Sequence, residues 1–158
     1  MMERPGRFSA TFDCDPDGTV DAVLNAGSAR GFTVTALHLN WQPEDMTSSS
    51  DLPQVAVTRF TGTASGGTAG TIFSHVDGDA PATSMRIEPT AVGSSPVPGP
   101  QFWPGVSSYT AGVWYLHGGQ YVADFEGSAV QVARNNSLLI HATKLITATV
   151  YLRENLVD

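Results

Sequence analysis

The chain has 158 residues, a length that suits one domain and is short for two. Charged residues make up only 15% of it, against about 25% in an average globular protein, which argues against a coiled coil, a helical array or a charged disordered tail. Fifteen acidic residues against eight basic ones give a net charge of −7. Such a surface repels the phosphates of nucleic acids and of anionic membranes, so we expect neither as a partner.

The ends and the cysteine content point to a domain that folds on its hydrophobic core. Residues 1–5 lead into polar sequence without the apolar core of a signal peptide, and no apolar run approaches the ~20 residues of a membrane span. The single cysteine, Cys14, has no partner for an internal disulfide. We therefore expect a protein that is made and matures in a reducing compartment.

Short strands account for most of the chain. In chain order they are predicted at residues 7–12, 32–41, 54–60, 83–88, 112–117, 121–125, 129–133, 137–142 and 146–152. The last strand alternates most clearly, with Ile146 and Val150 on one face and Thr147 and Tyr151 on the other, a period that a helix does not have. Within residues 32–41 the apolar positions change phase, which predicts a β-bulge near Ala36.

The connections between these runs favour a sandwich or a barrel. Gly118-Gly119 and Asn135-Asn136 stand where hairpin turns with positive φ are expected. Residues 61–70 and 92–105 are predicted to be long loops, the second rich in proline. The one alternative to strand is a short helix over residues 19–29, where apolar residues fall at helical spacing.

The sharpest local pattern is the acidic turn at residues 13–18. Asp13, Asp15 and Asp17 alternate before a glycine, as at the start of an EF-hand calcium loop. The position of that loop's bidentate glutamate is occupied by Leu24, and the preceding segment is predicted to be a strand and not a helix. The three aspartates are therefore candidate calcium ligands, with hydrogen bonds to nearby backbone amides in a turn as the alternative role. No other cofactor is indicated.

No catalytic motif is present. The histidines are scattered, without a His-x-His, His-Glu-x-x-His or Cys-x-x-Cys spacing that would indicate zinc, and Gly-x-Ser-x-Gly is absent. Asp124 and Glu126 lie two residues apart on a predicted strand, so they share a face. Such a pair is more typical of a solvated strand edge than of the acid–base pair of a glycan-degrading enzyme. We expect a protein that is not an enzyme.

Three stretches in the second part of the chain carry a resemblance to a known group of proteins. Residues 57–61 (VTRFT) precede a Gly/Thr/Ala loop, and residues 112–116 (GVWYL) lead through residues 137–140 (SLLI) to residues 147–154 (TATVYLRE). Over roughly residues 54–155 this pattern resembles the small structural proteins of tailed bacteriophages.

The resemblance implies a β-sandwich or jelly-roll module that decorates or cements capsids, usually as a homotrimer, without catalytic residues. The expected fold is an all-β, antiparallel, jelly-roll-like sandwich of about eight strands over residues 32–158. Residues 1–31 do not match and are expected to form an N-terminal segment that packs as an arm on a neighbour. The expected partners are the major capsid protein and further copies of the chain, in a virion assembled in the bacterial cytoplasm.

Two segments are candidates for contact with such partners. A low-charge surface rich in Thr, Ser, Ala and Gly suits packing against other protein copies, because charge is depleted in interface cores. Phe102 and Trp103 lie in the proline-rich loop and are candidate anchors. Residues 1–12 are the second candidate.

A carbohydrate-binding, lectin-like module is the alternative function. Trp41, Trp103 and Trp114 are candidates for stacking on sugar rings, and the aspartate loop would bind a calcium ion that assists sugar binding. Trp41 and Trp114 fall within predicted strands, where burial in the sandwich is the ordinary role of a tryptophan.

Overall fold

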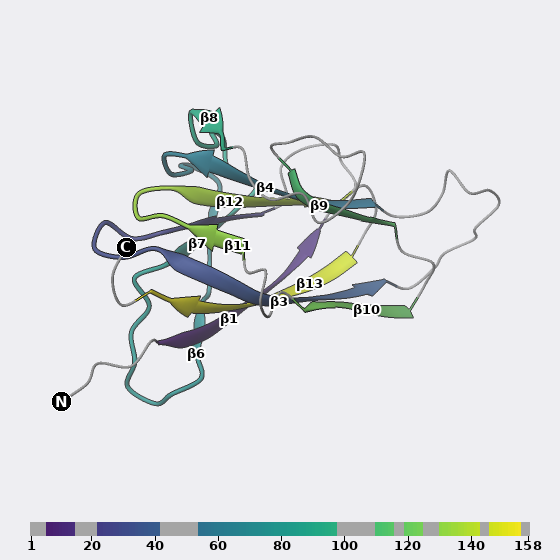
Figure 1. Ribbon diagram of the computed structural model, residues 1–158, viewed down its shortest axis with the longest axis horizontal. Coiled ribbons are helices and arrows are strands. Elements are labelled where there is room, and N and C mark those ends of the chain that lie inside the picture. Colours follow the sequence, from purple (N-terminus) through teal and green to yellow (C-terminus); the bar gives the residue numbers. More distant parts are fainter. Residues whose placement is uncertain are drawn as a thin grey trace.

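The computed structural model describes residues 6–14, 22–41, 54–97, 110–115, 119–124, 130–142 and 146–155. These residues form two antiparallel sheets that face each other as the layers of a sandwich (Figure 1). The described part of the chain contains thirteen strands and no helix. It accordingly holds no helix that is long and apolar enough to cross a membrane. The predicted all-β sandwich is confirmed.

One sheet, here called sheet A, has its strands in the order β10 (Gly119–Asp124), β3 (Phe32–Trp41), β13 (Ile146–Glu154), β1 (Arg7–Cys14) and β6 (Phe73–Ser74), with β11 (Val130–Val132) also paired to β3. The other, sheet B, has the order β5 (Thr68–Gly70), β7 (Ser84–Ile87), β2 (Ala22–Asn25), β12 (Ser137–Ala142), β4 (Gln54–Thr61) and β8 (Ser95–Pro96), with β9 (Thr110–Tyr115) also paired to β4.

Eight of these strands follow the path of a jelly roll. Sheet A contains the order β1-β13-β3-β10 and sheet B the order β2-β12-β4-β9, so the chain changes sheet at nearly every step. The jelly-roll-like prediction therefore holds, but a total of about eight strands is too low. The strands β5 to β8 lie in an insertion between β4 and β9, and β11 continues the line of β10 along β3.

The first part of the chain belongs to the sandwich. Strand β1 lies between β13 and β6, and β2 lies between β12 and β7. Phe8 and Phe12 of β1 and Leu24 of β2 are buried in the core. The sandwich therefore begins at β1 and not at Phe32. Residues 1–5 and 15–21 lie outside the described residues.

Strand β2 replaces the short helix that was the alternative for this segment. All four of its residues are buried, because β2 has a neighbouring strand on each side and is covered on both faces. A strand that is buried on both faces has a continuous apolar run instead of alternation. Such a run does not distinguish a strand from a buried helical turn by its periodicity.

The predicted bulge in β3 is confirmed. Along the pairing of β13 with β3, Tyr151 lies opposite Ala36 and Leu152 opposite Val34, which leaves Thr35 as the extra residue. The bulge restores the inward orientation of the apolar residues on both of its sides, and all four of them are buried: Phe32, Val34, Leu37 and Leu39.

The two predicted hairpins are wrong. The turn with positive φ that was predicted at Asn135-Asn136 is present at Asn135. This residue has a φ of 62°, as the turn requires. The strands on its two sides, β11 and β12, belong to different sheets, so the turn is a crossover between the layers. A hairpin was also predicted at Gly118-Gly119, but the strands on its two sides lie in different sheets, β9 in sheet B and β10, which begins at Gly119, in sheet A.

Side chains of the jelly-roll strands fasten the insertion to the sandwich. The amide of Asn25 donates to the carbonyl of Ala64 at 3.0 Å and accepts from its N–H at 2.8 Å, as a paired strand would. Near the middle of the insertion, Ala82 and Thr83 donate their N–H groups to the buried Glu154, at 2.6 Å and 2.8 Å. The segment 61–70 was predicted to be a loop, but its last three residues form β5, which pairs with β7.

Burial on β12 can be tested with two neighbouring leucines. Leu138 is fully buried in the core, whereas Leu139 points to the opposite face and is partly exposed. Leu138→Ala is expected to lower the free energy of unfolding by about 2–5 kcal/mol, because it leaves a cavity. Leu139→Ala is expected to cost about 1 kcal/mol or less. Urea titrations of both variants measure the difference, and equal losses would contradict the assigned register.

A second prediction concerns Glu154. Glu154→Ala leaves two backbone N–H groups without their acceptor, and we expect a loss of about 2–4 kcal/mol in the free energy of unfolding. Glu154→Gln keeps a side-chain oxygen for both donors, so it is expected to lose clearly less. Urea unfolding with hydrogen exchange at Ala82 and Thr83 measures both effects. An Ala variant as stable as the wild type would show that this contact does not hold the insertion.

Candidate functional site

The outer face of sheet A is the candidate site that the described residues define best. Because side chains alternate along a strand, one face of β1 and β13 points away from the core. The outward residues that lie opposite each other on these two strands are Arg7 and Arg153, Ser9 and Tyr151, Thr11 and Thr149, and Asp13 and Thr147. Apart from Tyr151, the outward side chains of these two strands are all Arg, Ser, Thr or Asp, so this face is polar.

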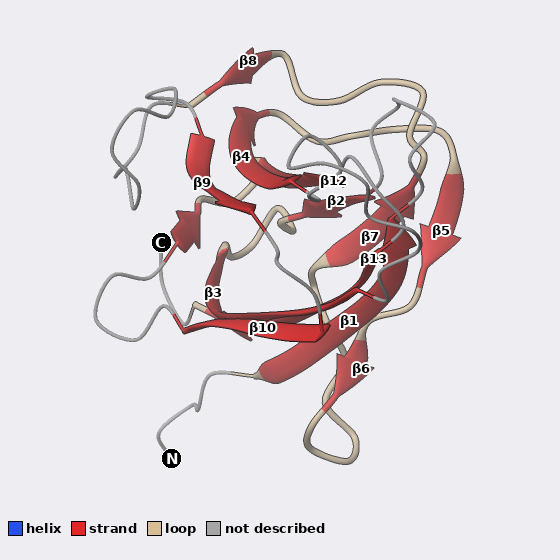
Figure 2. Ribbon diagram, turned by 90° about the vertical axis from the view of Figure 1, so that its right-hand side faces the viewer, coloured by secondary structure: helices blue, strands red, loops and turns tan. Residues whose placement is uncertain are grey.

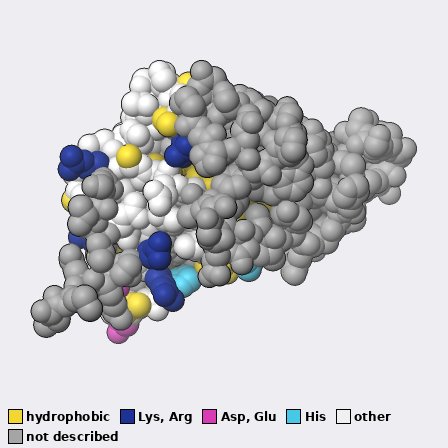
Figure 3. Space-filling view, in the orientation of Figure 1, with side chains coloured by type: hydrophobic (Ala, Val, Ile, Leu, Met, Phe, Trp, Pro, Cys, Tyr) yellow, Lys and Arg dark blue, Asp and Glu magenta, His cyan; other side chains and the backbone are white. Residues whose placement is uncertain are grey.

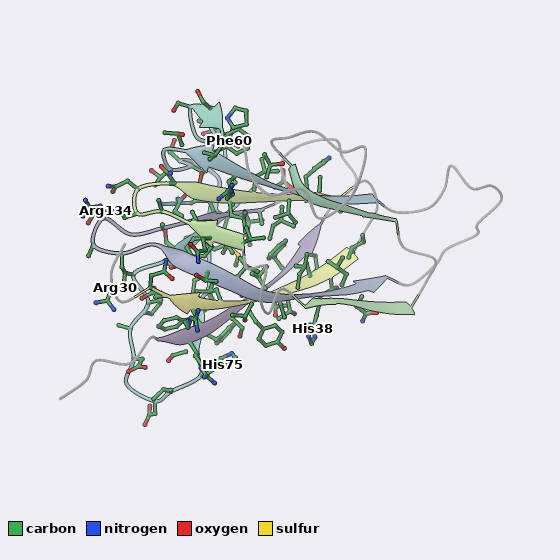
Figure 4. All side chains as sticks on the ribbon, viewed as in Figure 1. Arg30, His38, Phe60, His75 and Arg134 are labelled. Carbon is green, nitrogen blue, oxygen red and sulfur yellow. The ribbon has the colours of Figure 1, made fainter. Side chains whose placement is uncertain are left out.

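Three rings form a row across this face. Tyr151 has the His38 ring on one side at a centroid distance of 4.8 Å and the His75 ring on the other at 5.9 Å. The Nε2 atom of His75 also lies 3.0 Å from the Oγ atom of Ser9, within hydrogen-bond distance. Figure 4 shows both imidazoles on the side of sheet A that faces away from sheet B. Both histidines are exposed.

Positive charge lies at one end of this ring row. Arg7 and Arg153 are directly opposite each other on adjacent strands, and both are exposed. Neither side chain has an acidic partner among the residues that the structure describes. In Figure 3, dark blue basic side chains and a cyan histidine lie together near the lower margin of the molecule. Like charges placed directly opposite each other destabilise a sheet, so this pair is not explained by stability.

Asp13 lies at the other end of the same face. Its Oδ1 atom accepts a hydrogen bond from the Thr147 hydroxyl at 2.7 Å. The candidate calcium ligands Asp15 and Asp17 lie outside the described residues. Within the described ranges no three His, Cys, Asp or Glu side chains come together as a metal site. The calcium site stays a prediction.

The other candidate residues are placed only in part. Phe102, Trp103 and Glu126 lie outside the described residues. Trp41 ends β3, Trp114 belongs to β9 and Asp124 ends β10. The pairing of Asp124 with Glu126 therefore stays a prediction.

Arg59, from the segment that carries the resemblance, has a structural position. It lies on β4 in sheet B, and its Nη1 atom donates to the backbone carbonyl of Gln131 on β11 in sheet A at 3.0 Å. Desolvation by burial lowers the pKa of its guanidinium. The side chain therefore connects the two sheets at the side of the sandwich.

Sequence reasoning did not identify the ring row. Tyr151 and His38 are outward positions of predicted strands, so their orientation was readable from alternation once the bulge was included. His75 follows a two-residue strand inside the insertion, where no periodicity exists to place it. Its backbone N–H donates to the carbonyl of Arg7, which brings it to this face.

Comparisons with models of protein families, with curated proteins and with solved structures each find no match to this chain. The fold is therefore assigned from its own strand order.

The unfavourable arginine pair gives a testable prediction. Arg153→Gln removes one of two opposed charges and is expected to raise the free energy of unfolding by about 0.2–1 kcal/mol at low ionic strength. Arg153→Lys keeps the charge and is expected to give no gain. The gain should shrink at ~1 M salt, where the screening length falls to about 3 Å. Thermal and urea unfolding at both ionic strengths measure this, and a loss of stability in the Gln variant would contradict it.

Proposed function

We propose that this chain is a non-enzymatic structural protein of a bacteriophage virion, which binds the outer surface of the capsid and stabilises the head lattice. The resemblance of residues 54–155 to such proteins supports the proposal, as does the jelly-roll path of the strands. Because this fold hosts many functions, the fold alone does not distinguish a decoration protein from other kinds of protein. The distinction depends on a surface that is suited to contact with protein.

The observation that carries the proposal is the uncharged edge, residues 61–74. These residues contain no charged side chain, and most of them are exposed Thr, Ser, Ala and Gly. The edge includes β5 and β6, which end sheet B and sheet A on the same side of the sandwich (Figure 2). Phe73 on β6 is 58% exposed and is the only large hydrophobic side chain so exposed among the described residues.

This edge shares two features with the cores of protein interfaces, since it has no charged side chain and it exposes the aromatic ring of Phe73. Charge is depleted and aromatic residues are enriched in the cores of protein interfaces. Strands at the edge of a sheet, as β5 and β6 are, leave backbone donors and acceptors that a neighbouring chain can pair with. Several copies that each bind weakly would hold neighbouring capsid subunits together through multivalent attachment.

A charge placed in the uncharged edge tests the proposal. Thr68→Glu puts a carboxylate on β5 at an exposed position opposite Ile87. We expect the occupancy of this variant on assembled particles to fall at least about tenfold, because an interface core disfavours an unpaired charge. Ala133→Glu places the same charge at an exposed position next to the β11–β12 turn and serves as the matched control. Quantitative mass spectrometry of purified particles measures occupancy. Equal occupancy of both variants would contradict the role of the edge.

The same assay covers the two segments predicted to make contacts. Trp103→Ala and a deletion of residues 1–5 are expected to lower occupancy while the fold is kept. The deletion stops before Gly6, because the carbonyl of Gly6 accepts from the N–H of Glu154 at 2.9 Å.

Light scattering of the purified chain separates this proposal from the calcium-assisted carbohydrate-binding module. We expect a homotrimer whose mass is the same with calcium and with chelator. A monomer, or an assembly that dissociates in chelator, would contradict the decoration role and favour the calcium-dependent module.

A further inference from the structure

The outer face of sheet A has two features that attachment through the uncharged edge does not use. One is the pair of opposed arginines, Arg7 and Arg153, and the other is the ring row centred on Tyr151. They adjoin on the same strand, because Tyr151 and Arg153 are two positions apart on β13 and point the same way. In an acidic chain of net charge −7, a local pair of cations without a described acidic partner favours an anionic ligand.

The arginines select the kind of anion. A guanidinium presents a planar fork of donors that matches the two oxygens of a carboxylate. The two guanidiniums start from directly opposite positions on strands that lie about 5 Å apart, so they can share one carboxylate or hold two. The two positive charges repel each other in the free protein. A bound anion relieves this repulsion, and this gain favours binding.

The rest of the face selects what carries the carboxylate. The centre is a single row of rings, in which His38 and His75 are exposed and Tyr151 is half-buried. Hydroxyl groups of Ser9, Thr11 and Thr149 border it. This face carries charge at both ends, with Arg7 and Arg153 at one and Asp13 at the other, whereas charge is depleted in the cores of protein interfaces. A saccharide instead offers flat C–H surfaces for an aromatic ring and many hydroxyl groups for polar side chains.

The spacing fits a sugar acid. Residues two apart on a strand are separated by about 7 Å, so a pyranose ring placed over Tyr151 has its carboxylate within reach of the long Arg153 side chain. The Arg7 side chain lies opposite on β1. His38 and His75 extend the ring row on both sides and supply polar atoms for neighbouring sugar units.

We propose that the outer face of sheet A binds a carboxylate-bearing saccharide, with a sugar ring on Tyr151 and its carboxylate held by Arg7 and Arg153. The residues that form this site are not the tryptophans or the aspartates of the alternative function, and the site does not depend on the decoration role.

Isothermal titration calorimetry of the full chain with galacturonic acid trisaccharide tests the site. Galactose trisaccharide keeps the rings and lacks the carboxylates, and triglutamate keeps the carboxylates and lacks the rings. We expect trigalacturonate to bind at least about tenfold more tightly than either. The affinity is expected to fall as salt is added, since exposed charges are screened.

Variants locate the binding. Arg7→Gln, Arg153→Gln and Tyr151→Ala are each expected to weaken trigalacturonate binding about tenfold or more, whereas Tyr151→Phe keeps the ring and should keep most of the affinity. Arg86→Gln removes one positive charge from β7 in sheet B and is the matched control, expected to change affinity less than about twofold. Thermal unfolding confirms that each variant is folded.

Three results would overturn the proposal. The first is the absence of binding to trigalacturonate by the wild-type chain. The second is equal affinity for triglutamate, which would make the face a site for acidic polypeptide. The third is binding that persists in Tyr151→Ala or in both arginine variants, which would place the sugar elsewhere.

Discussion

The pairing of β13 with β1 and β3 is the interaction on which the rest of the structure depends. Strand β13 alternates along its whole length, so its inward side chains fill the core and its outward side chains form the centre of the candidate site. Its last residue, Glu154, turns inward and binds the insertion through two backbone N–H groups. Core, site and insertion are thus positioned by one strand, and a slip of one residue in its register would exchange the two faces.

The bulge at Thr35 matters to the site as much as to the core. Without the extra residue, alternation from Phe32 would turn His38 inward and Leu37 outward. With it, Leu37 is buried and His38 lies outside against Tyr151. The bulge therefore has two effects: it keeps the apolar residues of β3 in the core, and it places His38 in the ring row.

Charge is distributed so that different surfaces suit different partners. The uncharged edge, residues 61–74, exposes Phe73 and is suited to contact with protein. The outer face of sheet A exposes Arg7, Arg153 and two histidine rings beside the half-buried Tyr151, and is suited to a hydrophilic anion. A module with both surfaces could be held on a particle by one and present the other to saccharides outside it.

The sequence by itself determined the strands whose residues alternate, because alternation within a strand is a local property of the chain. Residues 137–142 and 146–152 and the bulge near Ala36 were predictable in this way. Only the tertiary structure decided that residues 22–25 form a strand, that Asn135 turns between layers, and that the first strands belong to the sandwich. It also decided the candidate site, since Arg7 meets Arg153, and Ser9 meets His75, through pairing between distant segments. Local patterns carry no record of such partners, because register and sheet order are fixed by burial of the whole core.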